Sequence, residues 1–444
     1  MKKFMTTITM TAMFSLLLSP AVFAAEEGVI DTGDTTWVII ALALVLFMHV
    51  PGLALFYGGL VSERNVVSTM MHSFVSLLIV TIVWVLWGYS LSYGTSIGGF
   101  IGALDYIGMN NVDGAAYPGL TIPHYLFAAL QIVYVAITVA IISGGISGRI
   151  SFKAWIPFCI LWPTIVYAPM AHAVWGGGWL SQMGELDFAG GTVVHITAGV
   201  AALVAALVIG PRKRAAQDKP HNIVFFLFGA AALWFGWFGF NGGSALASGS
   251  ITSLAVINTH VAGAAGGIAW LIIEWSVRKR PSLVGTATGA ISGLVAITPA
   301  AGFVTVPAAL LIGFIGGPVA YFSIKFIKSK FKYDDTLDAF GVHGMAGIWG
   351  ALATGLFATT SVNEAGNNGL FYGNAEQLLH QAAGVATSIL LTIVGTFVIL
   401  KIIALFTPLR VSEDEELLGL DISHHAEPAY HHEDDVTAEP ALNK

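Results

Sequence analysis

Long apolar stretches, separated by short polar connections, run through the whole chain. A helix needs about 20 residues to cross a bilayer, and eleven stretches suit that role, at positions 35–59, 67–93, 122–145, 152–170, 189–210, 222–242, 253–276, 284–299, 303–328, 342–360 and 378–406. The segment 96–110 is also apolar but is not counted as a span. The pattern therefore predicts an all-α polytopic membrane protein with eleven transmembrane helices.

The lysines and arginines that follow the first three residues fall in alternate connections only. One set of connections carries all of them except Lys444 in the tail, at Arg64 and in the segments 149–153, 212–219, 278–280, 325–332 and 401–410. The other set, around 94–121, 171–188, 243–252, 299–303 and 361–377, carries none. By the positive-inside rule the basic connections are cytoplasmic. The mature N-terminus is then outside and the C-terminus inside, which requires an odd number of helices.

The start of the chain has the pattern of a signal peptide. Lys2 and Lys3 precede an apolar run at 10–18, and the small-residue sequence A-V-F-A follows. This order is typical of a cleaved secretory signal, which we assign to residues 1–24. Residues 25–409 then form the transmembrane domain, and residues 410–444 form an acidic cytoplasmic tail.

A weak internal repeat divides the transmembrane domain. The first predicted helix ends in L-F-Y-G-G-L (55–60) and the sixth in G-F-N-G-G-S (239–244). The fifth and the tenth carry the frames D-F-A-G-G-T-V-V-H and D-T-L-D-A-F-G-V-H. The first half, at about 35–210, holds five helices, so the second half, at about 222–360, begins on the opposite side of the membrane. The two halves therefore have inverted topology, and the helix at 378–406 lies outside the repeat. Inverted repeats place a substrate site at the midplane between them.

Composition supports the bilayer assignment and excludes a disulfide framework. Hydrophobic residues make up 56% of the chain and charged residues 10%, whereas soluble domains have roughly 25% charged residues. The 51 glycines are dispersed, which favours close helix packing on faces such as Gly263 to Gly267. Cys159 is the one cysteine. The net charge of -7 comes mostly from the tail and says little about substrate.

Two histidines stand out because they lie within apolar stretches. His195 and His343 each follow an aspartate, Asp187 and Asp335, by eight residues. An ionisable residue at membrane depth is costly and marks a pathway. A single histidine of this kind is more often a core residue with satisfied hydrogen bonds, but two in matching frames predict one shared site.

Several segments together resemble a known family. They are A-H-A-V-W-G-G-G (171–178), L-D-F-A-G-G-T-V-V-H-I, W-F-G-F-N-G-G-S-A, G-A-I-S-G-L-V-A-I-T-P-A and D-x-F-G-V-H-G. In this order, over about 35 to 425, they resemble the Amt/Mep/Rh ammonium transporter family, and its bacterial Amt branch most closely. The resemblance implies a homotrimer in the cytoplasmic (inner) membrane of a bacterium, with one narrow pore in each subunit and a role in nitrogen uptake.

The resemblance also implies an outer site for ammonium, with methylammonium as a further candidate substrate. Trp175 and Ser244 match the residues that recruit the cation, and Phe240 matches one ring of the gate below them. The chemistry agrees, because ammonium only donates hydrogen bonds: Trp175 offers a cation–π face and Ser244 an oxygen acceptor. Aligning Gln131 puts Tyr134 where the family usually has the second gate phenylalanine. The phenol keeps the ring and adds a hydroxyl group.

His195 and His343 match the paired histidines of the family's pore. Each neutral imidazole has one donor and one acceptor nitrogen, and its ordinary pKa of ~6.5 allows proton exchange. A bare cation crosses an apolar lumen at high cost, which favours deprotonation at the gate and separate transfer of the proton. Asp187 could ligate a cation, but its place before the fifth helix favours a structural N-cap. Asp335 is its expected structural counterpart.

The remaining histidines are expected to be structural or solvated. His124, His172 and His260 are interpreted as structural or loop residues. The tail histidines His424, His425, His431 and His432 could bind a metal, but a solvated tail is the favoured interpretation. The chain has no HExxH motif, phosphate loop or nucleophile elbow, so we expect no catalytic residue, cofactor or resident metal, and no nucleic-acid partner.

Two other functions compete with transport. An ammonium sensor would use the same fold to signal to a cytoplasmic partner, but sensors usually carry an added domain, whereas about 35 residues follow Leu409. An intramembrane His-metal enzyme would need a third ligand and a general base. The tail, with L-R-V and G-L-D-I-S-H, resembles the family segment that is docked on the cytoplasmic face, couples the subunits and lies beside the docking surface of a PII-type protein. The basic segments at 212–214, 278–280 and 325–332 are expected to face this acidic tail.

Overall fold

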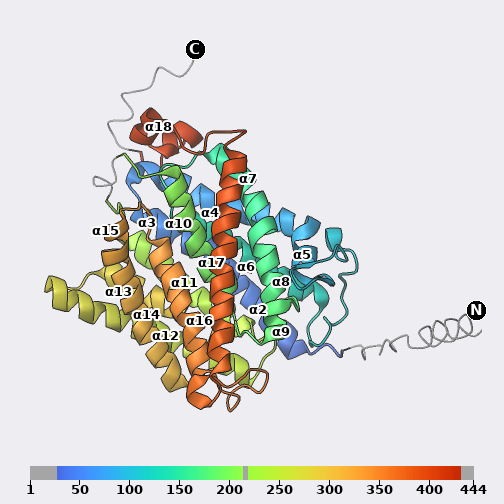
Figure 1. Cartoon of the computed structure of the whole chain (residues 1–444). Coiled ribbons are helices and arrows are strands. Elements are labelled where there is room, and N and C mark those ends of the chain that lie inside the picture. Colours follow the sequence, from blue (N-terminus) through green and yellow to red (C-terminus); the bar gives the residue numbers. More distant parts are fainter. Residues whose placement is uncertain (1–27, 214–218, 432–444) are drawn as a thin grey trace, which may run out of the picture.

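The computed structural model of the chain describes residues 28–213 and 219–431 (Figure 1). The predicted signal peptide at 1–24, Arg214 and the tail from His432 onward lie outside the described residues. Within them the fold is a bundle of long helices, with the tail helix α18 (Glu413–Leu418) at one end and the short helix α9 (Trp179–Met183) at the other. We call these the tail end and the Trp175 end.

The described residues hold ten helices that are long and apolar enough to cross a membrane. They are Thr32–Leu60, Glu63–Tyr93, His124–Ser143, Phe152–Met183, Gly191–Ile209, Ile223–Gly243, Ser250–Arg278, Val306–Phe331, Phe340–Phe357 and Glu376–Ile403. Leu283–Ile297 is a further apolar helix of shorter length. Each overlaps one predicted stretch, so the helical, polytopic membrane fold is confirmed. The number of crossings and their sidedness stay predictions.

Many spans in the first half consist of α-helical pieces joined by π-helical turns. The elements in order are α2 (Thr32–Phe47), η1 (Met48–Leu53), α3 (Ala54–Leu60), η2 (Glu63–Asn65), α4 (Val66–Val83), η3 (Trp84–Gly88), α5 (Tyr89–Tyr93), α6 (His124–Ser143), α7 (Phe152–Trp162), η5 (Pro163–Tyr167), α8 (Ala168–Val174), α9, η6 (Gly191–Ile196) and α10 (Thr197–Ile209). The fourth span therefore runs to Met183, beyond the predicted end at 170, because α9 continues it after a glycine turn.

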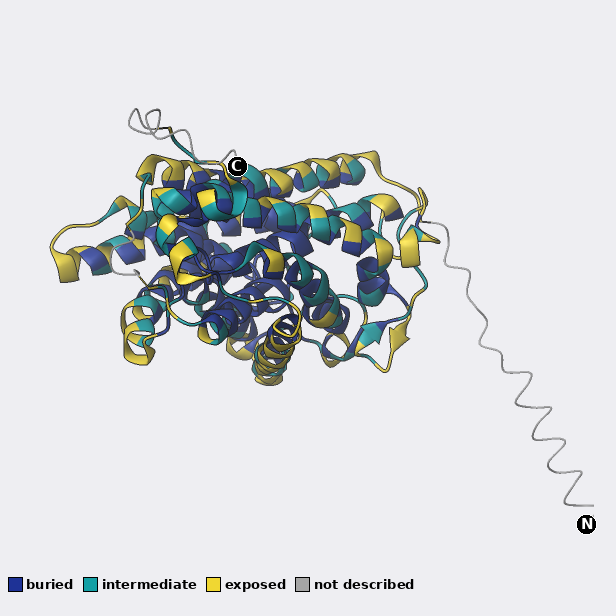
Figure 2. Cartoon of the chain, turned by 90° about the horizontal axis from the view of Figure 1, so that it is seen from above, coloured by how far each residue is buried: buried dark blue, intermediate teal, exposed yellow. Residues whose placement is uncertain are grey.

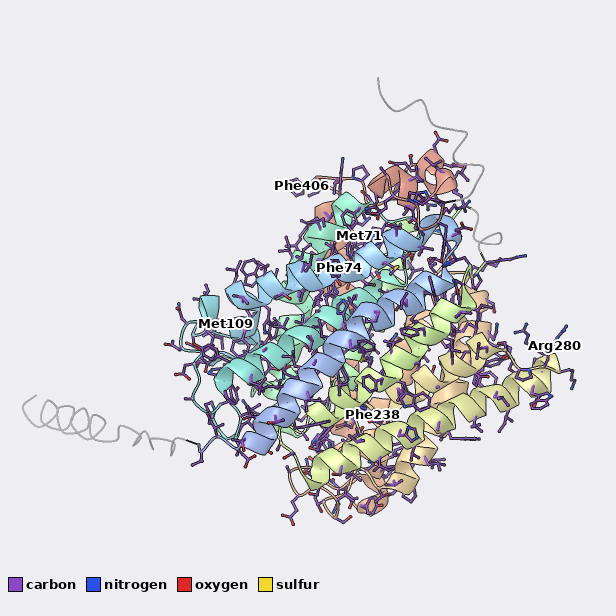
Figure 3. All side chains as sticks on the ribbon, turned by 180° about the vertical axis from the view of Figure 1, so that it is seen from behind. Met71, Phe74, Met109, Phe238, Arg280 and Phe406 are labelled. Carbon is purple, nitrogen blue, oxygen red and sulfur yellow. The ribbon has the colours of Figure 1, made fainter. Side chains whose placement is uncertain are left out.

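The second half continues with long helices and ends in the tail. Its elements are α11 (Ile223–Gly243), α12 (Ser250–Arg278), α13 (Leu283–Ile297), α14 (Val306–Phe322), η7 (Ser323–Ile327), α15 (Lys328–Phe331), η8 (Phe340–Met345), α16 (Ala346–Phe357), η9 (Leu370–Tyr372), α17 (Glu376–Ile403), α18 and η10 (Asp421–His425). The end of α12, marked by Arg280, projects beyond the bundle (Figure 3).

The segment at 96–110 is not a span. It forms a two-stranded antiparallel sheet, β1 (Ser96–Ile97) with β2 (Ile101–Gly102), and a short turn η4 (Ile107–Met109). Ser96 pairs with Gly102 across the sheet. This small hairpin is the described exception to the all-α prediction.

Buried residues fill the middle of the bundle, whereas exposed residues lie on its outer helix faces (Figure 2). Large apolar side chains such as Phe228, Leu390 and Val394 are exposed on these faces. Because apolar outer faces suit lipid rather than water, this distribution is typical of a membrane protein.

Glycines bring two spans, Gly191–Ile209 and Phe340–Phe357, the fifth and tenth of the eleven predicted helices, into backbone contact. A methyl group at Gly199 would overlap the backbone of Gly344, and one at Gly347 would lie 3.2 Å from the Cβ of His195. Small residues allow membrane helices to approach this closely. The contact places the two histidine frames side by side.

The tail is docked on the bundle, as the family resemblance implies, whereas the solvated tail favoured for its histidines is wrong for this part of it. Asp421 accepts hydrogen bonds from the backbone of Val67 and Ser68, at the start of α4. Glu416 accepts from the backbone of Lys213 at 2.6 Å and from Arg410 at 2.6 Å. These hydrogen bonds take the place of the bonds to water that the same carboxylates and donors would make if the tail were solvated.

The tail histidines share in this docking. Nδ1 of His424 accepts a hydrogen bond from the backbone of Phe152 at 3.4 Å, and the ring of His425 meets the Phe152 ring edge-on at 4.9 Å. Burial lowers the pKa of both imidazoles. They are therefore packing residues rather than solvated ones.

Only one of the three basic segments forms ion pairs with the tail in the described residues. Lys213 pairs with Glu413 at 3.2 Å, whereas Arg278 pairs with Glu274 on its own helix and Lys328 pairs with Asp338. No ion pair between the described tail and the segments at 278–280 and 325–332 supports the prediction that these segments also face the tail.

Candidate functional site

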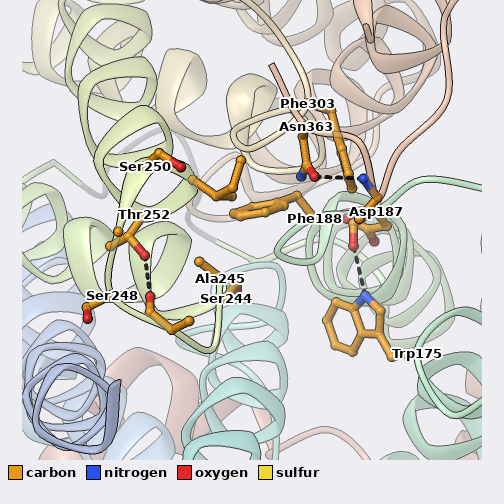
Figure 4. Close-up of a pocket in the computed structure, with 14 residues that line it drawn as sticks. Trp175, Asp187, Phe188, Ser244, Ala245, Ser248, Ser250, Thr252, Phe303 and Asn363 are labelled. Carbon is orange, nitrogen blue, oxygen red and sulfur yellow. Dashed lines mark hydrogen bonds between the residues drawn. The ribbon is translucent and has the colours of Figure 1, made fainter. Parts of the chain in front are cut away.

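A pocket of about 450 Å³ opens at the Trp175 end of the bundle. Trp175, Asp187 and Phe188 lie on one side of it, and Ser244, Ser248 and Thr252 lie opposite (Figure 4). The structure thus brings together Trp175 and Ser244, which are far apart in sequence and were both predicted for the outer site. We call this space the outer pocket.

Trp175 is held by the chain that follows it. It ends α8, and its indole Nε1 donates a hydrogen bond to the carbonyl oxygen of Asp187 at 2.8 Å. Since this donor is engaged, the indole ring has a fixed orientation and its face remains part of the pocket wall (Figure 4).

The Asp187 carboxylate caps the turn that carries His195. Its Oδ1 accepts from the backbone N–H groups of Gly190 and Gly191, and its Oδ2 from those of Thr192 and Val193. The Thr192 hydroxyl donates to the same oxygen at 2.5 Å. Five donors surround one carboxylate, so its charge is compensated by the start of η6 and α10.

Asp335 has the corresponding place before the second histidine. Its carboxylate accepts from the backbone of Ala339 at 3.1 Å and of Phe340 at 2.8 Å, at the start of η8. Burial raises the pKa of this carboxyl to about 6, while Lys328 acts in the opposite direction. Each aspartate of the repeated frame thus fixes the start of the helix that presents its histidine.

A second carboxyl group lies next to Asp187, and the sequence reasoning did not single it out. Glu185 is 5% exposed, and its Oε1 lies 3.2 Å from the Thr192 hydroxyl oxygen. Its Oε2 has no hydrogen-bond partner among the described residues. Burial, and then the charge of Asp187, raise the pKa of Glu185 well above its usual value. The sequence signal that could have identified Glu185 is its position two residues before the capping aspartate Asp187.

Two aromatic rings lie beneath the outer pocket. The rings of Tyr134 and Phe240 have centroids 4.8 Å apart and an interplanar angle of 59°. Tyr134 is 2% exposed and Phe240 is fully buried. The Tyr134 hydroxyl lies 3.0 Å from the carbonyl oxygen of Phe240 and 3.1 Å from the Ser244 hydroxyl oxygen. The two rings predicted to form a gate are therefore in contact.

The two histidines meet directly below these rings. The ring of His195 lies 5.9 Å from that of Phe240 and 5.3 Å from that of His343. Nδ1 of His195 and Nδ1 of His343 are 3.3 Å apart, within hydrogen-bond distance. Trp237 stacks on His195 at 5.5 Å. Both histidines are buried, so the pair lies in an apolar surrounding.

A second cavity, of about 240 Å³, reaches His343 from the tail end. Its lining combines apolar and polar side chains, namely Phe56, Tyr57, Leu60, Val61, Arg212, Pro220, Val284, Thr288, Thr336, Leu337, Asp338, Val342 and His343. We call this space the inner cavity. The rings of Tyr134 and Phe240 and the imidazoles of His195 and His343 separate the inner cavity from the outer pocket. The two cavities and these side chains form a narrow line between the two ends of the bundle.

The other histidines of interest lie away from this line. His172 is buried in α8, and its nitrogens lie close to Ser92 and Ser96. His124 starts α6 and contacts the Tyr89 hydroxyl at 2.6 Å. His260 lies within α12 beside Trp234 and Phe238, so it is not a loop residue. In the described part of the chain, no group of three or more His, Cys, Asp or Glu side chains could hold a metal ion.

The profile of the Ammonium Transporter Family matches residues 36–430. The chain belongs to this family. It is 52% identical over 402 residues to the ammonium transporter of Bacillus subtilis, covering 90% of this chain and 98% of the relative. The ammonium transporter of Aquifex aeolicus is 48% identical over 411 residues, covering 91% and 95%.

Solved structures that are similar to this chain have the same fold. Mep2 of Candida albicans superposes with a TM-score of 0.83 at 34% identity and covers 93% of this chain and 94% of its own. A structure described as a sensor Amt protein superposes with a TM-score of 0.81 at 31% identity, covering 88% and 98%. The resemblance inferred from the sequence motifs is thereby confirmed.

Proposed function

We propose that the chain transports ammonium across the cytoplasmic membrane of a bacterium. The observation that carries this proposal is the arrangement of an outer pocket, two contacting aromatic rings, two facing histidines and an inner cavity in one line. The named relatives are ammonium transporters, and the absence of catalytic motifs in the sequence favours transport over catalysis.

The outer pocket supplies what a small cation that only donates hydrogen bonds requires. Trp175 presents an aromatic face, and Ser244 presents an oxygen acceptor across the pocket. Asp187 contributes negative charge nearby, but five donors already occupy its oxygens, so it shapes the site instead of binding the cation directly.

The apolar line below the gate favours movement of ammonia without its proton. An ammonium ion at the level of Phe240 would lose its water with few oxygen atoms to replace it, which is costly. Deprotonation at the gate lets the neutral molecule pass, and His195 and His343 offer a separate path for the proton. Tyr134 and Phe240 close the path until the substrate arrives.

Sidedness, assembly and regulation belong to the same proposal. The Trp175 end faces outside and the tail end faces the cytoplasm, because the basic connections lie at the tail end. The eleven helices form an inverted repeat with a final helix, and the subunit assembles as a homotrimer. A PII-type protein is the proposed cytoplasmic regulator, and it blocks the inner cavity from the tail end.

A sensor is the second candidate function. It is favoured by the similarity to a solved structure described as a sensor Amt protein. A sensor that binds without transporting would show ligand-dependent changes but no flux.

The test is a current measurement on purified protein in proteoliposomes that receive ammonium pulses. A transporter gives a current or a pH change that depends on ammonium concentration and saturates. Protein that binds ammonium but gives neither signal would support the sensor instead, and protein with no response of either kind would contradict both functions.

A further inference from the structure

We propose that the Tyr134 hydroxyl oxygen is a second oxygen ligand for the substrate, one step below Ser244, and that it makes the gate selective for ammonium over methylammonium. The inference rests on the proposed function and deepens it. Its starting point is the close approach of three oxygen atoms: the Ser244 hydroxyl, which lines the outer pocket, and the Tyr134 hydroxyl and Phe240 carbonyl buried beside it.

Counting protons shows which of these oxygens can still accept a hydrogen bond. The Ser244 hydroxyl donates to the Phe240 carbonyl at 2.9 Å. The Tyr134 hydroxyl has one proton and lies 3.0 Å from the same carbonyl. A hydroxyl that has donated its proton keeps two lone pairs as acceptors. With both protons on the Phe240 carbonyl, both hydroxyl oxygens remain able to accept.

The two hydroxyl oxygens are close enough to act in succession. They lie 3.1 Å apart, so an N–H group bonded to Ser244 can transfer to Tyr134 by a short movement. Ser244 lines the outer pocket, whereas Tyr134 is buried beneath it and contacts the Phe240 ring. The phenol therefore extends the oxygen path to the point where the aromatic gate begins.

A phenylalanine at this position would offer the ring but no oxygen. The substrate would then have no hydroxyl oxygen beyond Ser244 before it meets the gate rings and His195, whose ring lies 5.9 Å from that of Phe240. Ammonium has four N–H donors, whereas methylammonium has three and a methyl group that prefers apolar surroundings. An extra oxygen beside the contact of the two gate rings thus favours ammonium, and its removal favours methylammonium.

The hydroxyl also anchors the closed gate. Its bond to the Phe240 carbonyl joins α6 to α11, and the ring must move away from this position for the path to open. Anchoring alone would change the rate for both substrates equally. Selectivity is therefore the measurement that separates a ligand from an anchor.

The experiment measures ammonium and methylammonium transport in proteoliposomes for Tyr134→Phe, Ser244→Ala and the double variant. We expect Tyr134→Phe to remain active, to raise the apparent KM for ammonium by about tenfold or more, the effect of losing one hydrogen bond to a charged group, and to lower the ammonium to methylammonium ratio several-fold. The double variant should be less impaired than the product of the single effects, because the two oxygens act in one path.

Tyr167→Phe is the matched control. Tyr167 is also fully buried in a span, and its hydroxyl has no hydrogen-bond partner among the described residues. We expect this variant to leave both the KM and the ratio unchanged. Tyr134→Phe with a changed rate but the wild-type ratio and KM would overturn the proposal and leave only the anchor. Because that variant would still transport ammonium, the proposed function itself would stand.

Discussion

His195 and His343 are 148 residues apart in sequence, yet their Nδ1 atoms face each other at 3.3 Å. A hydrogen bond between two identical nitrogens requires one protonated and one unprotonated partner. The two rings therefore hold opposite tautomers, and a proton that enters at one ring can leave from the other after both exchange tautomers. This arrangement is suited to moving a proton through an apolar passage without a chain of water molecules.

We predict that His195→Ala or His343→Ala abolishes the ammonium-driven current while the protein stays folded and oligomeric. Only the proton path is lost, because the backbones of Gly199 and Gly344 keep the two spans in contact without either imidazole. Current and size-exclusion profile are measured on the same preparation. His260→Ala is the control, since His260 lies in a span away from the line. Wild-type current and ion selectivity in both pore variants would remove the twin-histidine mechanism.

Tyr134→Ala tests the gate rather than the hydroxyl. The substitution removes the ring that contacts Phe240 at 4.8 Å and leaves a cavity between the outer pocket and His195. We expect altered uptake and the admission of other small cations such as potassium, measured as current with ammonium replaced. A variant that matches the wild type in both respects would mean that the closure lies elsewhere.

Glu185→Gln tests the buried carboxyl next to Asp187. Its pKa is raised by burial, so the folded protein holds the proton more tightly than the unfolded chain does. The stabilising contribution of the neutral group is complete below its ordinary pKa of 4.5 and is lost as the pH rises toward the raised value. A glutamine side chain does not ionise, so its contribution to the stability of the folded protein does not fall as the pH rises.

We therefore expect the Glu185→Gln variant and the wild type to have similar melting temperatures near pH 4.5, with an advantage for the variant that grows toward neutral and alkaline pH. Thermal unfolding in detergent over this pH range checks the prediction. Glu376→Gln is the control, since that side chain is 75% exposed. A difference that does not depend on pH would show that Glu185 is ionised in the folded protein.

Deleting the chain from Val411 onward should lower transport several-fold while insertion and assembly remain intact. The described tail contacts lie at one end of the bundle, where Asp421 caps α4 and Glu416 joins Arg410 to the backbone of Lys213. Exposed pairs such as Lys213 with Glu413 contribute only ~0–1 kcal/mol, so the buried caps should matter more.

A shorter deletion of residues 432–444 is the control for the tail, because it removes none of the described contacts. A PII-type partner should lose its effect in the longer deletion only. Full transport and full inhibition by such a partner after the longer deletion would show that the tail is not needed for either.

The sequence predicted the spans from local signals, and the family resemblance singled out residues that the structure brings together. Apolar length predicts a helix, and the Asp187 and Asp335 frames mark the turns that carry the histidines. It did not find Glu185, whose burial depends on contact with Thr192 and with α17. Nor did it predict that His424 and His425 pack on Phe152, because a polar, acidic segment gives no local sign of a docking surface.

The Tyr134 hydroxyl shows a different limit. An alignment places the residue at the gate, but only coordinates show that its oxygen approaches Ser244 and the Phe240 carbonyl together. These groups come from α6 and α11, and their spacing depends on how the helices cross.

Gly199 and Gly344 carry no functional group, yet their backbone contact determines how closely the two histidines approach. A single added methyl group there would force the fifth and tenth spans apart and could silence conduction without touching any atom that meets the substrate. Loss-of-function variants in this protein are thus expected at positions that a survey of ligand contacts would overlook. Such a variant would keep its affinity for ammonium at the outer pocket and would lose only the ability to conduct it.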